Sequence, residues 1–234
     1  TAKWQPSKAC SEYCDEEGRV LSQALAQNVA SRITQQNGQV TEVKKQRKQL
    51  NAPLPYSLSS LQVDASKRFG MAAKAVLDTC QSLYEKHKLI TYPRSDCRYL
   101  PEDHHAEAAT ICQAIHNNSQ ALKAACGGVN TQQKNAAWNN KKVTAHHAII
   151  PTARQLGSGI NHLSGDEAKV YELIARQYLA QFYPVHRFDE TTITLKILTG
   201  DFIARAKCLV EQGWKALYGN KSSADKKPEG GQTL

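Results

Sequence analysis

The chain has 234 residues and a mass of 25.9 kDa, with 41% hydrophobic and 22% charged residues, a balance typical of folded globular proteins and unlike that of disordered chains. No apolar run reaches the roughly 18 to 20 residues that a membrane span needs, and residues 1–14 lack the apolar core of a signal peptide, so we expect a cytoplasmic protein with no membrane partner. The formal charge of +9 favours a phosphate-rich partner, although an ordinary solvated basic face gives the same signal.

The seven cysteines are odd in number and contain no C-x-x-C pair, which predicts reduced thiols rather than a disulfide framework. Cys10 and Cys14 could supply half of a zinc site, but no further ligands lie near them, so we expect no metal site in this chain. The chain begins at Thr1 and has a single methionine, which favours a piece of a larger protein.

The first predicted helix lies near the amino terminus and ends near residues 37–38. Its apolar stripe recurs every four residues and comprises Leu21, Leu25, Val29 and Ile33. A polar and basic stretch follows, and Pro53 and Pro55 then stiffen the chain. We therefore place a domain boundary between residues 52 and 53.

Two helices are predicted at the start of the central block. Ser59 and Gln62 have the spacing of a capping box for a helix that ends at Gly70. The side chains that this helix turns inward are Leu61, Ala65 and Phe69. The buried face of the next helix comprises Val76, Leu77, Cys80, Leu83 and Tyr84. The short apolar run at residues 89–91 then predicts an extended segment that leads to Tyr92.

Two more helices are predicted in this block, on either side of a polar stretch. One follows Pro101, which suits a first helical turn. Its buried side comprises Ala108, Ile111, Cys112 and Ile115. Residues 117–142 are polar and predict a long surface excursion. Ser164 and Glu167 then form a second capping box, for a helix that ends before Pro184.

The periodicity changes from helical to alternating after residue 184. Residues 193–197 and 202–208 alternate apolar and polar side chains around the turn residues Thr199-Gly200-Asp201, which predicts an antiparallel hairpin. Residues 222–234 are rich in Lys, Gly and Ser and are expected to be disordered.

These elements predict an α+β fold with a discontinuous domain. Residues 1–52 and 184–234 form the two parts of a β-rich domain, the second part carrying the disordered tail. Residues 53–183 form a helical domain inserted between them.

The densest polar cluster surrounds Tyr92. Pro93 favours an extended backbone at Tyr92, and alternate residues of an extended segment share a face. The residues expected on this face are Tyr92, Arg94, Asp96 and Arg98. Guanidinium groups favour the phenolate form of tyrosine and bind phosphate, so Tyr92 is a candidate nucleophile. The same residues also fit a structural tyrosine beside a surface ion pair.

The second polar cluster contains the adjacent residues His146 and His147. Neighbouring residues of a strand point to opposite sides, so at most one imidazole is expected to face Tyr92. Such an imidazole could donate a hydrogen bond to a phosphate oxygen, whereas a metal role would need further ligands. The sequence lacks G-x-x-x-x-G-K-[ST], G-x-G-x-x-G and H-E-x-x-H, which argues against an NTPase, a dinucleotide enzyme and a zinc protease.

Three ordered motifs resemble those of type IA DNA topoisomerases. They are A-P-L-P-Y-S-L-S-S-L-Q at 52–62, L-I-T-Y-P-R-S-D-C-R-Y-L-P at 89–101 and A-H-H-A-I-I-P-T at 145–152. The resemblance extends from Lys3 to about Gly219. It implies that a winged-helix-like domain carrying the tyrosine is inserted in a β-rich arch, and that the two domains swing as a DNA gate.

The resemblance also implies roles for individual residues. Tyr92 matches the tyrosine that attacks a single-stranded DNA phosphodiester and forms a 5′-phosphotyrosine without ATP. Arg94 matches the arginine that steadies the scissile phosphate, and His146 matches the histidine at the phosphate backbone. Further DNA contacts are implied for Gln62, His104 and His147. Residues 5–18 match a loop associated with the separation of linked DNA circles, or decatenation.

In that family an acidic TOPRIM domain binds Mg²⁺, and this domain and part of the toroid base would precede the segment. The resemblance therefore implies Mg²⁺ bound outside this chain, and little or no cleavage by the chain alone. Two alternatives stay open. One is a non-catalytic DNA-binding module with a winged-helix-like clamp. The other is a tyrosine recombinase, in which the nucleophile normally follows the Arg and His residues, whereas Tyr92 precedes His146.

Overall fold

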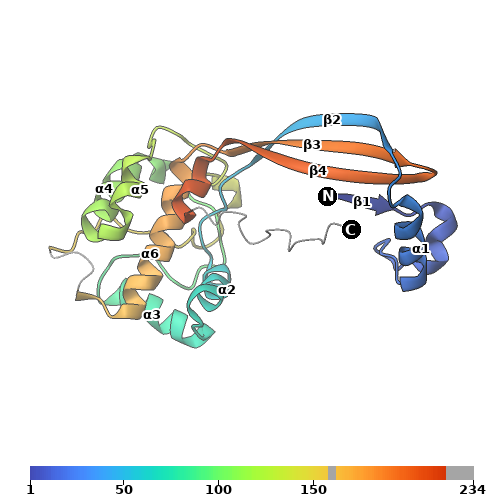
Figure 1. Ribbon diagram of the computed structural model, residues 1–234. Coiled ribbons are helices and arrows are strands. Elements are labelled where there is room, and N and C mark those ends of the chain that lie inside the picture. Colours follow the sequence, from blue (N-terminus) through green and yellow to red (C-terminus); the bar gives the residue numbers. More distant parts are fainter. Residues whose placement is uncertain (158–161, 220–234) are drawn as a thin grey trace. The chain divides into compact units, whose positions relative to one another are not determined.

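A computed structural model describes residues 1–157 and 162–219 (Figure 1). The predicted disordered tail, residues 222–234, lies outside the described residues. In the described part of the chain, no helix is long and apolar enough to cross a membrane.

The chain divides into two compact units. The first comprises residues 1–50 and 187–211, and the second comprises the described residues of 51–186 and 212–219. The boundaries predicted after residues 52 and 183 lie close to the first two changes of unit. The return of the chain to the second unit at Gln212 has no counterpart in the sequence prediction.

The first unit is built on a four-stranded sheet in the order β1-β4-β3-β2. The strands are β1 (Ala2–Gln5), β2 (Gly38–Leu50), β3 (His186–Ile197) and β4 (Gly200–Glu211). The predicted hairpin is confirmed as β3 and β4, which pair antiparallel. Its turn lies one residue earlier than predicted, because Gly200 already pairs with Ile197. Leu198 takes the turn position with φ +54°, the left-handed conformation common in tight hairpins.

The basic stretch after the first helix forms β2, which sequence periodicity missed. All its residues are exposed, so no apolar alternation marks it. Its cations pair instead with carboxylates of β3. Arg47 donates to Asp189 from Nε at 2.9 Å, Lys45 Nζ lies 3.2 Å from the same carboxylate, and Lys48 bonds to Glu190. Hydrogen bonds from Arg47, then from Lys45, lower the pKa of Asp189 to about 2 although burial opposes them.

The first predicted helix is confirmed as α1 (Gln23–Ile33), which follows a 3-10 helix at Lys8–Tyr13. Ser22 caps α1, because its Oγ accepts a hydrogen bond from the amide of Leu25. Leu21, expected at the start of the apolar stripe, precedes this cap and is exposed. The other three stripe residues are half-buried.

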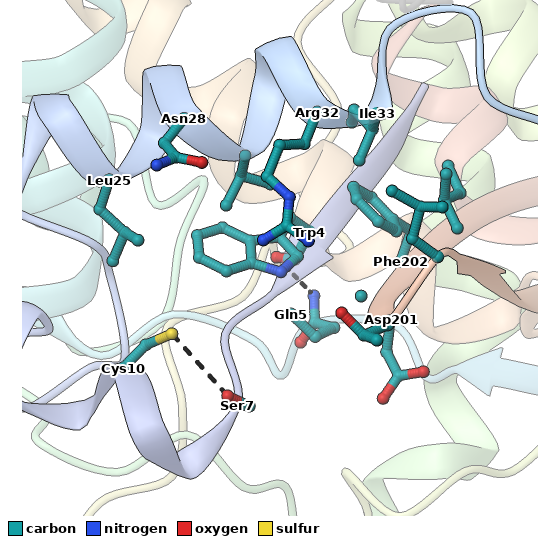
Figure 2. Close-up of a pocket in the computed structure, with 15 residues that line it drawn as sticks. Trp4, Gln5, Ser7, Cys10, Leu25, Asn28, Arg32, Ile33, Asp201 and Phe202 are labelled. Atoms are coloured by element: carbon teal, nitrogen blue, oxygen red, sulfur yellow. Dashed lines mark hydrogen bonds between the residues drawn. The ribbon is translucent and has the colours of Figure 1, made fainter.

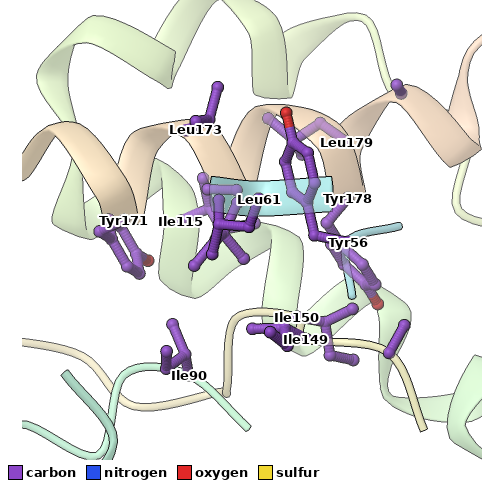
Figure 3. Packing of buried hydrophobic residues seen from close by; sticks show 14 of the residues in the cluster. Tyr56, Leu61, Ile90, Ile115, Ile149, Ile150, Tyr171, Leu173, Tyr178 and Leu179 are labelled. Carbon is purple, nitrogen blue, oxygen red and sulfur yellow. The ribbon is translucent and has the colours of Figure 1, made fainter. Parts of the chain in front are cut away.

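The second unit is helical and contains the larger core. Its helices are α2 (Leu58–Phe69), α3 (Ala73–Glu85), α4 (Ala108–Asn118), α5 (Lys123–Gly127) and α6 (Gly165–Leu179). Figure 3 shows Leu61 of α2, Ile115 of α4 and Tyr178 of α6 in the same buried cluster as Ile149 and Ile150. The helices of this unit therefore pack on the segment that contains the second histidine motif.

The sequence prediction for α2 needs two corrections. The capping box is formed by Ser57 and Ser60 rather than by Ser59 and Gln62, because the helix begins at Leu58. Phe69 is 39% exposed rather than buried, since it lies in the last turn and faces the ammonium group of Lys169. Gly70 ends the helix as predicted, with φ +69°.

The predicted helix after Pro101 begins as a 3-10 turn at Asp103–Glu107 and continues as α4, whose predicted buried side is confirmed. The surface excursion predicted for residues 117–142 is wrong in part. Leu122 is buried, because this stretch packs back on the helical core.

The capping box at the start of α6 is confirmed and extends to α3. Glu167 accepts a hydrogen bond from the amide of Ser164 at 2.7 Å and another from Ser82 Oγ at 2.6 Å. Its carboxylate also lies 3.2 Å from Nε2 of His87. Burial alone would raise the pKa of Glu167, but the hydrogen bonds from Ser82 and Ser164 outweigh it and lower the pKa to about 2.

We expect Glu167→Gln to lower the free energy of unfolding at pH 7 by about 1–2 kcal/mol, because hydrogen bonds to a charged group are lost. The pKa in the folded state lies below its ordinary value of 4.5, so this stabilisation is present above pH 4.5 and is lost as the pH falls toward 2. Urea denaturation at several pH values measures both effects.

Asp166→Asn is the matched control, because Asp166 lies in the same turn with an exposed side chain. We expect it to change stability little. An equal effect of Glu167→Gln at every pH would contradict a role for the carboxylate charge.

Candidate active site

Tyr92 lies at the end of an extended segment that is fixed to the second histidine motif. The amide of Thr91 donates to the carbonyl of Ile150 at 2.9 Å, and Thr91 Oγ1 accepts from the amide of Ile150 at 3.0 Å. Ile90 forms an isolated bridge with Pro151. These bonds hold Tyr92 in place while its side chain stays 37% exposed.

Alternate residues after Tyr92 are exposed, as an extended segment requires. Arg94 and Asp96 share this exposure, whereas the residues between them are buried. Arg98 departs from the pattern. Its Nε donates to the carbonyl of Pro55 and a terminal nitrogen donates to that of Leu54. Its guanidinium therefore binds backbone carbonyls of another segment. The expectation that Arg98 acts beside Tyr92 is therefore wrong.

The rings nearest to Tyr92 are those of His146 and Tyr84. The ring centroids of Tyr92 and His146 lie 4.4 Å apart, and Tyr84 of α3 meets Tyr92 edge-on at 5.8 Å. His147 turns elsewhere, because its Nδ1 donates to the carbonyl of Ala148 at 2.8 Å. The prediction that the adjacent histidines face different partners is confirmed.

Helix α3 positions the guanidinium of Arg94. A terminal nitrogen of Arg94 donates to Gln81 Oε1 at 3.0 Å, and Gln81 Nε2 donates in turn to Glu85 at 2.9 Å. Gln81 is not among the residues predicted from the sequence. Its spacing of three residues from Tyr84 places both on one face of α3, and this spacing was the available signal.

The remaining predicted DNA contacts lie at two other places. His104 meets the ring of His147 edge-on, with centroids 4.8 Å apart. Gln62 donates from Nε2 to the carbonyl of Ala73 at 2.9 Å and so links α2 to α3. The structure therefore pairs Tyr92 with His146 and His104 with His147, and it holds Gln62 at a junction of helices.

The exposed side chains of Tyr92, His146 and Arg94 present a phenol, an imidazole and a guanidinium. Cationic and hydrogen-bond-donating groups of this kind bind phosphate, and a phenol can attack it. Among the described residues, no three His, Cys, Asp or Glu side chains gather closely enough to hold a metal ion. These residues do not fit a Mg²⁺ site, and no chemical step is assigned to a metal that they would hold.

A family model described as DNA topoisomerase matches residues 2–233, nearly the whole chain. The chain therefore belongs to the DNA topoisomerase family, and the resemblance to its type IA members is confirmed. Within this family, the chain is 54% identical over 225 residues to DNA topoisomerase 3 of Haemophilus influenzae and 52% identical over 224 residues to that of Vibrio cholerae. Each alignment covers 96% of this chain and 34% of the relative, so the chain spans about a third of their length.

A solved structure shows the same fold. Full-length topoisomerase I from Thermotoga maritima aligns with 92% of this chain and 34% of its own, with a TM-score of 0.63 and 21% sequence identity. At this identity the match supports the mixed helix and sheet architecture and no residue role.

The geometry predicts the protonation state of His147. Burial lowers the pKa of His147 below 6.5, the nearby His104 and His146 lower it further, and the hydrogen bond with Ala148 acts in the opposite direction. We expect its ring to be neutral at pH 7 and to gain a proton only below pH 6.5, as measured by NMR titration.

His104→Gln should raise this pKa, because it exposes the His147 ring and removes a neighbouring imidazole. His116→Gln, on α4, is the control and should leave it unchanged. A titration of His147 above 6.5 would contradict the burial that the structure gives it.

Proposed function

We propose that this chain is the DNA-gate segment of a type IA topoisomerase and that Tyr92 is its nucleophile. The observation that carries the proposal is the exposed tyrosine beside His146, on an extended segment fixed by backbone hydrogen bonds, in a chain of the DNA topoisomerase family. A solvent-accessible phenol can reach a DNA phosphate, whereas a packing tyrosine need not be accessible.

In the proposed reaction, Tyr92 Oη attacks the phosphorus of a single-stranded phosphodiester. A phosphorus–oxygen bond to tyrosine forms as the bond to the 3′ oxygen breaks. The phenol loses its proton and the 3′ oxygen gains one, which leaves a 5′-phosphotyrosine and a 3′ hydroxyl. Because one phosphodiester replaces another, the reverse step rejoins the strand without ATP.

Two further side chains support this step. The Arg94 guanidinium, aimed by Gln81, offsets the charge that grows on the non-bridging phosphate oxygens. The His146 imidazole, beside the Tyr92 ring, donates a hydrogen bond to the phosphate backbone. Together they stabilise the transition state more than they stabilise the bound ground state, which lowers the barrier.

The proposed partners are single-stranded DNA and the remaining domains of the enzyme. Gln62, His104 and His147 extend the contact with single-stranded DNA, which is held mainly through its backbone and in a salt-dependent way. The second unit is the winged-helix-like domain of the gate, and the first is the arch. Residues 5–18 assist decatenation. A TOPRIM domain would supply the Mg²⁺ site, toroid-base residues would complete the enzyme, and the activity is cytoplasmic.

The chemical test uses a chimera in which the remaining two thirds come from the Haemophilus influenzae relative. With Mg²⁺ and a single-stranded oligonucleotide, we expect a covalent protein–DNA adduct on denaturing gels, and Tyr92→Phe should abolish it. Tyr99→Phe, the same change on the same segment, should leave it intact. An adduct that survives in Tyr92→Phe would refute the assignment, and DNA binding without any adduct would favour a non-catalytic module.

A second test separates catalysis from binding by Arg94. In the same chimera, Arg94→Ala should slow cleavage by roughly a hundredfold, the scale expected when one preorganised charge contact is removed. Its affinity for the oligonucleotide should fall by only a few fold. Arg154→Ala removes an exposed arginine elsewhere in the unit and serves as the control. Equal losses of rate and affinity would reduce Arg94 to a binding contact.

A further inference from the structure

A pocket of about 320 Å³ lies in the first unit, between β1, α1 and the β3–β4 turn (Figure 2). Trp4 of β1 and Phe202 of β4 stand opposite each other in the sheet register and form its aromatic side. Leu25 and Val29 of α1 complete the apolar wall. This volume is at the small end of ligand sites and suits one flat group rather than a large ligand.

Polar side chains reach the same space. Asn28 and Arg32 are four residues apart and so lie on one face of α1. Figure 2 shows both on the side of the helix that faces the indole of Trp4. Within the described part of the chain, neither side chain has a hydrogen bond or ion pair of its own. The Ser7 hydroxyl also lines the pocket, whereas the carboxylate of Asp201 lies 4.0 Å from Lys196 Nζ and points away from the indole (Figure 2).

We propose that this pocket receives one unstacked base of single-stranded DNA, a proposal that rests on the proposed function for the identity of the nucleic acid. A half-buried indole gives a base a stacking surface, and aromatic stacking tolerates any sequence because every base has a flat face. The edges of a base carry both donors and acceptors. The amide of Asn28 offers both in return, and the guanidinium of Arg32 adds further donors.

The same lining argues against a phosphate group as the occupant. A phosphate would accept from Arg32, but it would gain nothing from the indole, and the apolar wall would take water away from its charge without replacing it. The DNA backbone can instead follow Lys3 and Lys8, which are exposed and flank Trp4 in the sequence. The first unit thus binds single-stranded DNA through its own residues, separately from the residues around Tyr92.

Binding by the full 234-residue chain tests this inference. The probe is a short fluorescein-labelled oligothymidylate, followed by fluorescence anisotropy. Trp4→Leu should weaken binding roughly tenfold, the scale of one lost stacking contact, whereas Trp4→Phe should retain most of the affinity. Arg32→Gln changes an exposed residue and should weaken binding more than Arg205→Gln, which removes the same charge on β4 outside the pocket.

Cysteine protection gives a second readout in the unaltered chain. Cys10 lines the pocket, whereas Cys208 is exposed on β4. The oligothymidylate should slow alkylation of Cys10 by iodoacetamide but not that of Cys208, as measured by peptide mass spectrometry. Circular dichroism verifies that each variant is folded.

Two results would overturn the inference. One is equal affinity of Arg32→Gln and Arg205→Gln together with unprotected Cys10. The other is unchanged affinity of a folded Trp4→Leu variant. These outcomes are independent of the adduct test, since neither the anisotropy nor the alkylation measurement depends on a covalent step. Pocket binding without an adduct in the chimera would contradict the nucleophile, and an adduct without pocket binding would contradict only this inference.

Discussion

The geometry around Tyr92 depends on the backbone hydrogen bonds between residues 89–91 and 150–152. Thr91 and Ile150 are 59 positions apart in the sequence, yet backbone and side-chain bonds join them, and the amide of Thr152 donates to the carbonyl of Leu89 at 2.9 Å. The pairing buries apolar side chains on the core side and leaves Tyr92 and His146 beside each other. Together with the hydrogen bond from the amide of Ala148 to the carbonyl of Tyr99, it fixes the relation between two motifs that are distant in the sequence.

Helix α3 joins the site around Tyr92 to the core of the second unit. Leu83 is fully buried, while Gln81 on another face of the same helix holds Arg94. Between them Ser82 donates to Glu167 at the start of α6. A site carried by a helix that is anchored at consecutive residues is held more precisely than one carried by a loop. The capping interaction of α6 therefore also contributes to the position of Arg94.

Local patterns in the sequence predicted much of the fold, because helix periodicity, caps and hairpin alternation are local properties. Leu61 and Ala65 were expected in the core and lie there, and Gly70 ends its helix. The strand β2 escaped prediction because its lysines and arginines find their partners across the sheet, which no local pattern records. Arg98 was misjudged for the same reason, since its guanidinium donates to a carbonyl 43 residues away.

The strand β2 has thirteen residues and not one buried side chain. Peeling it from β3 would therefore break hydrogen bonds and ion pairs but would expose little apolar surface, and salt weakens such exposed pairs. Residues 38–50 also lead directly into the second unit. The chain thus enters the second unit from a strand that is held mainly by hydrogen bonds and ion pairs rather than by apolar burial.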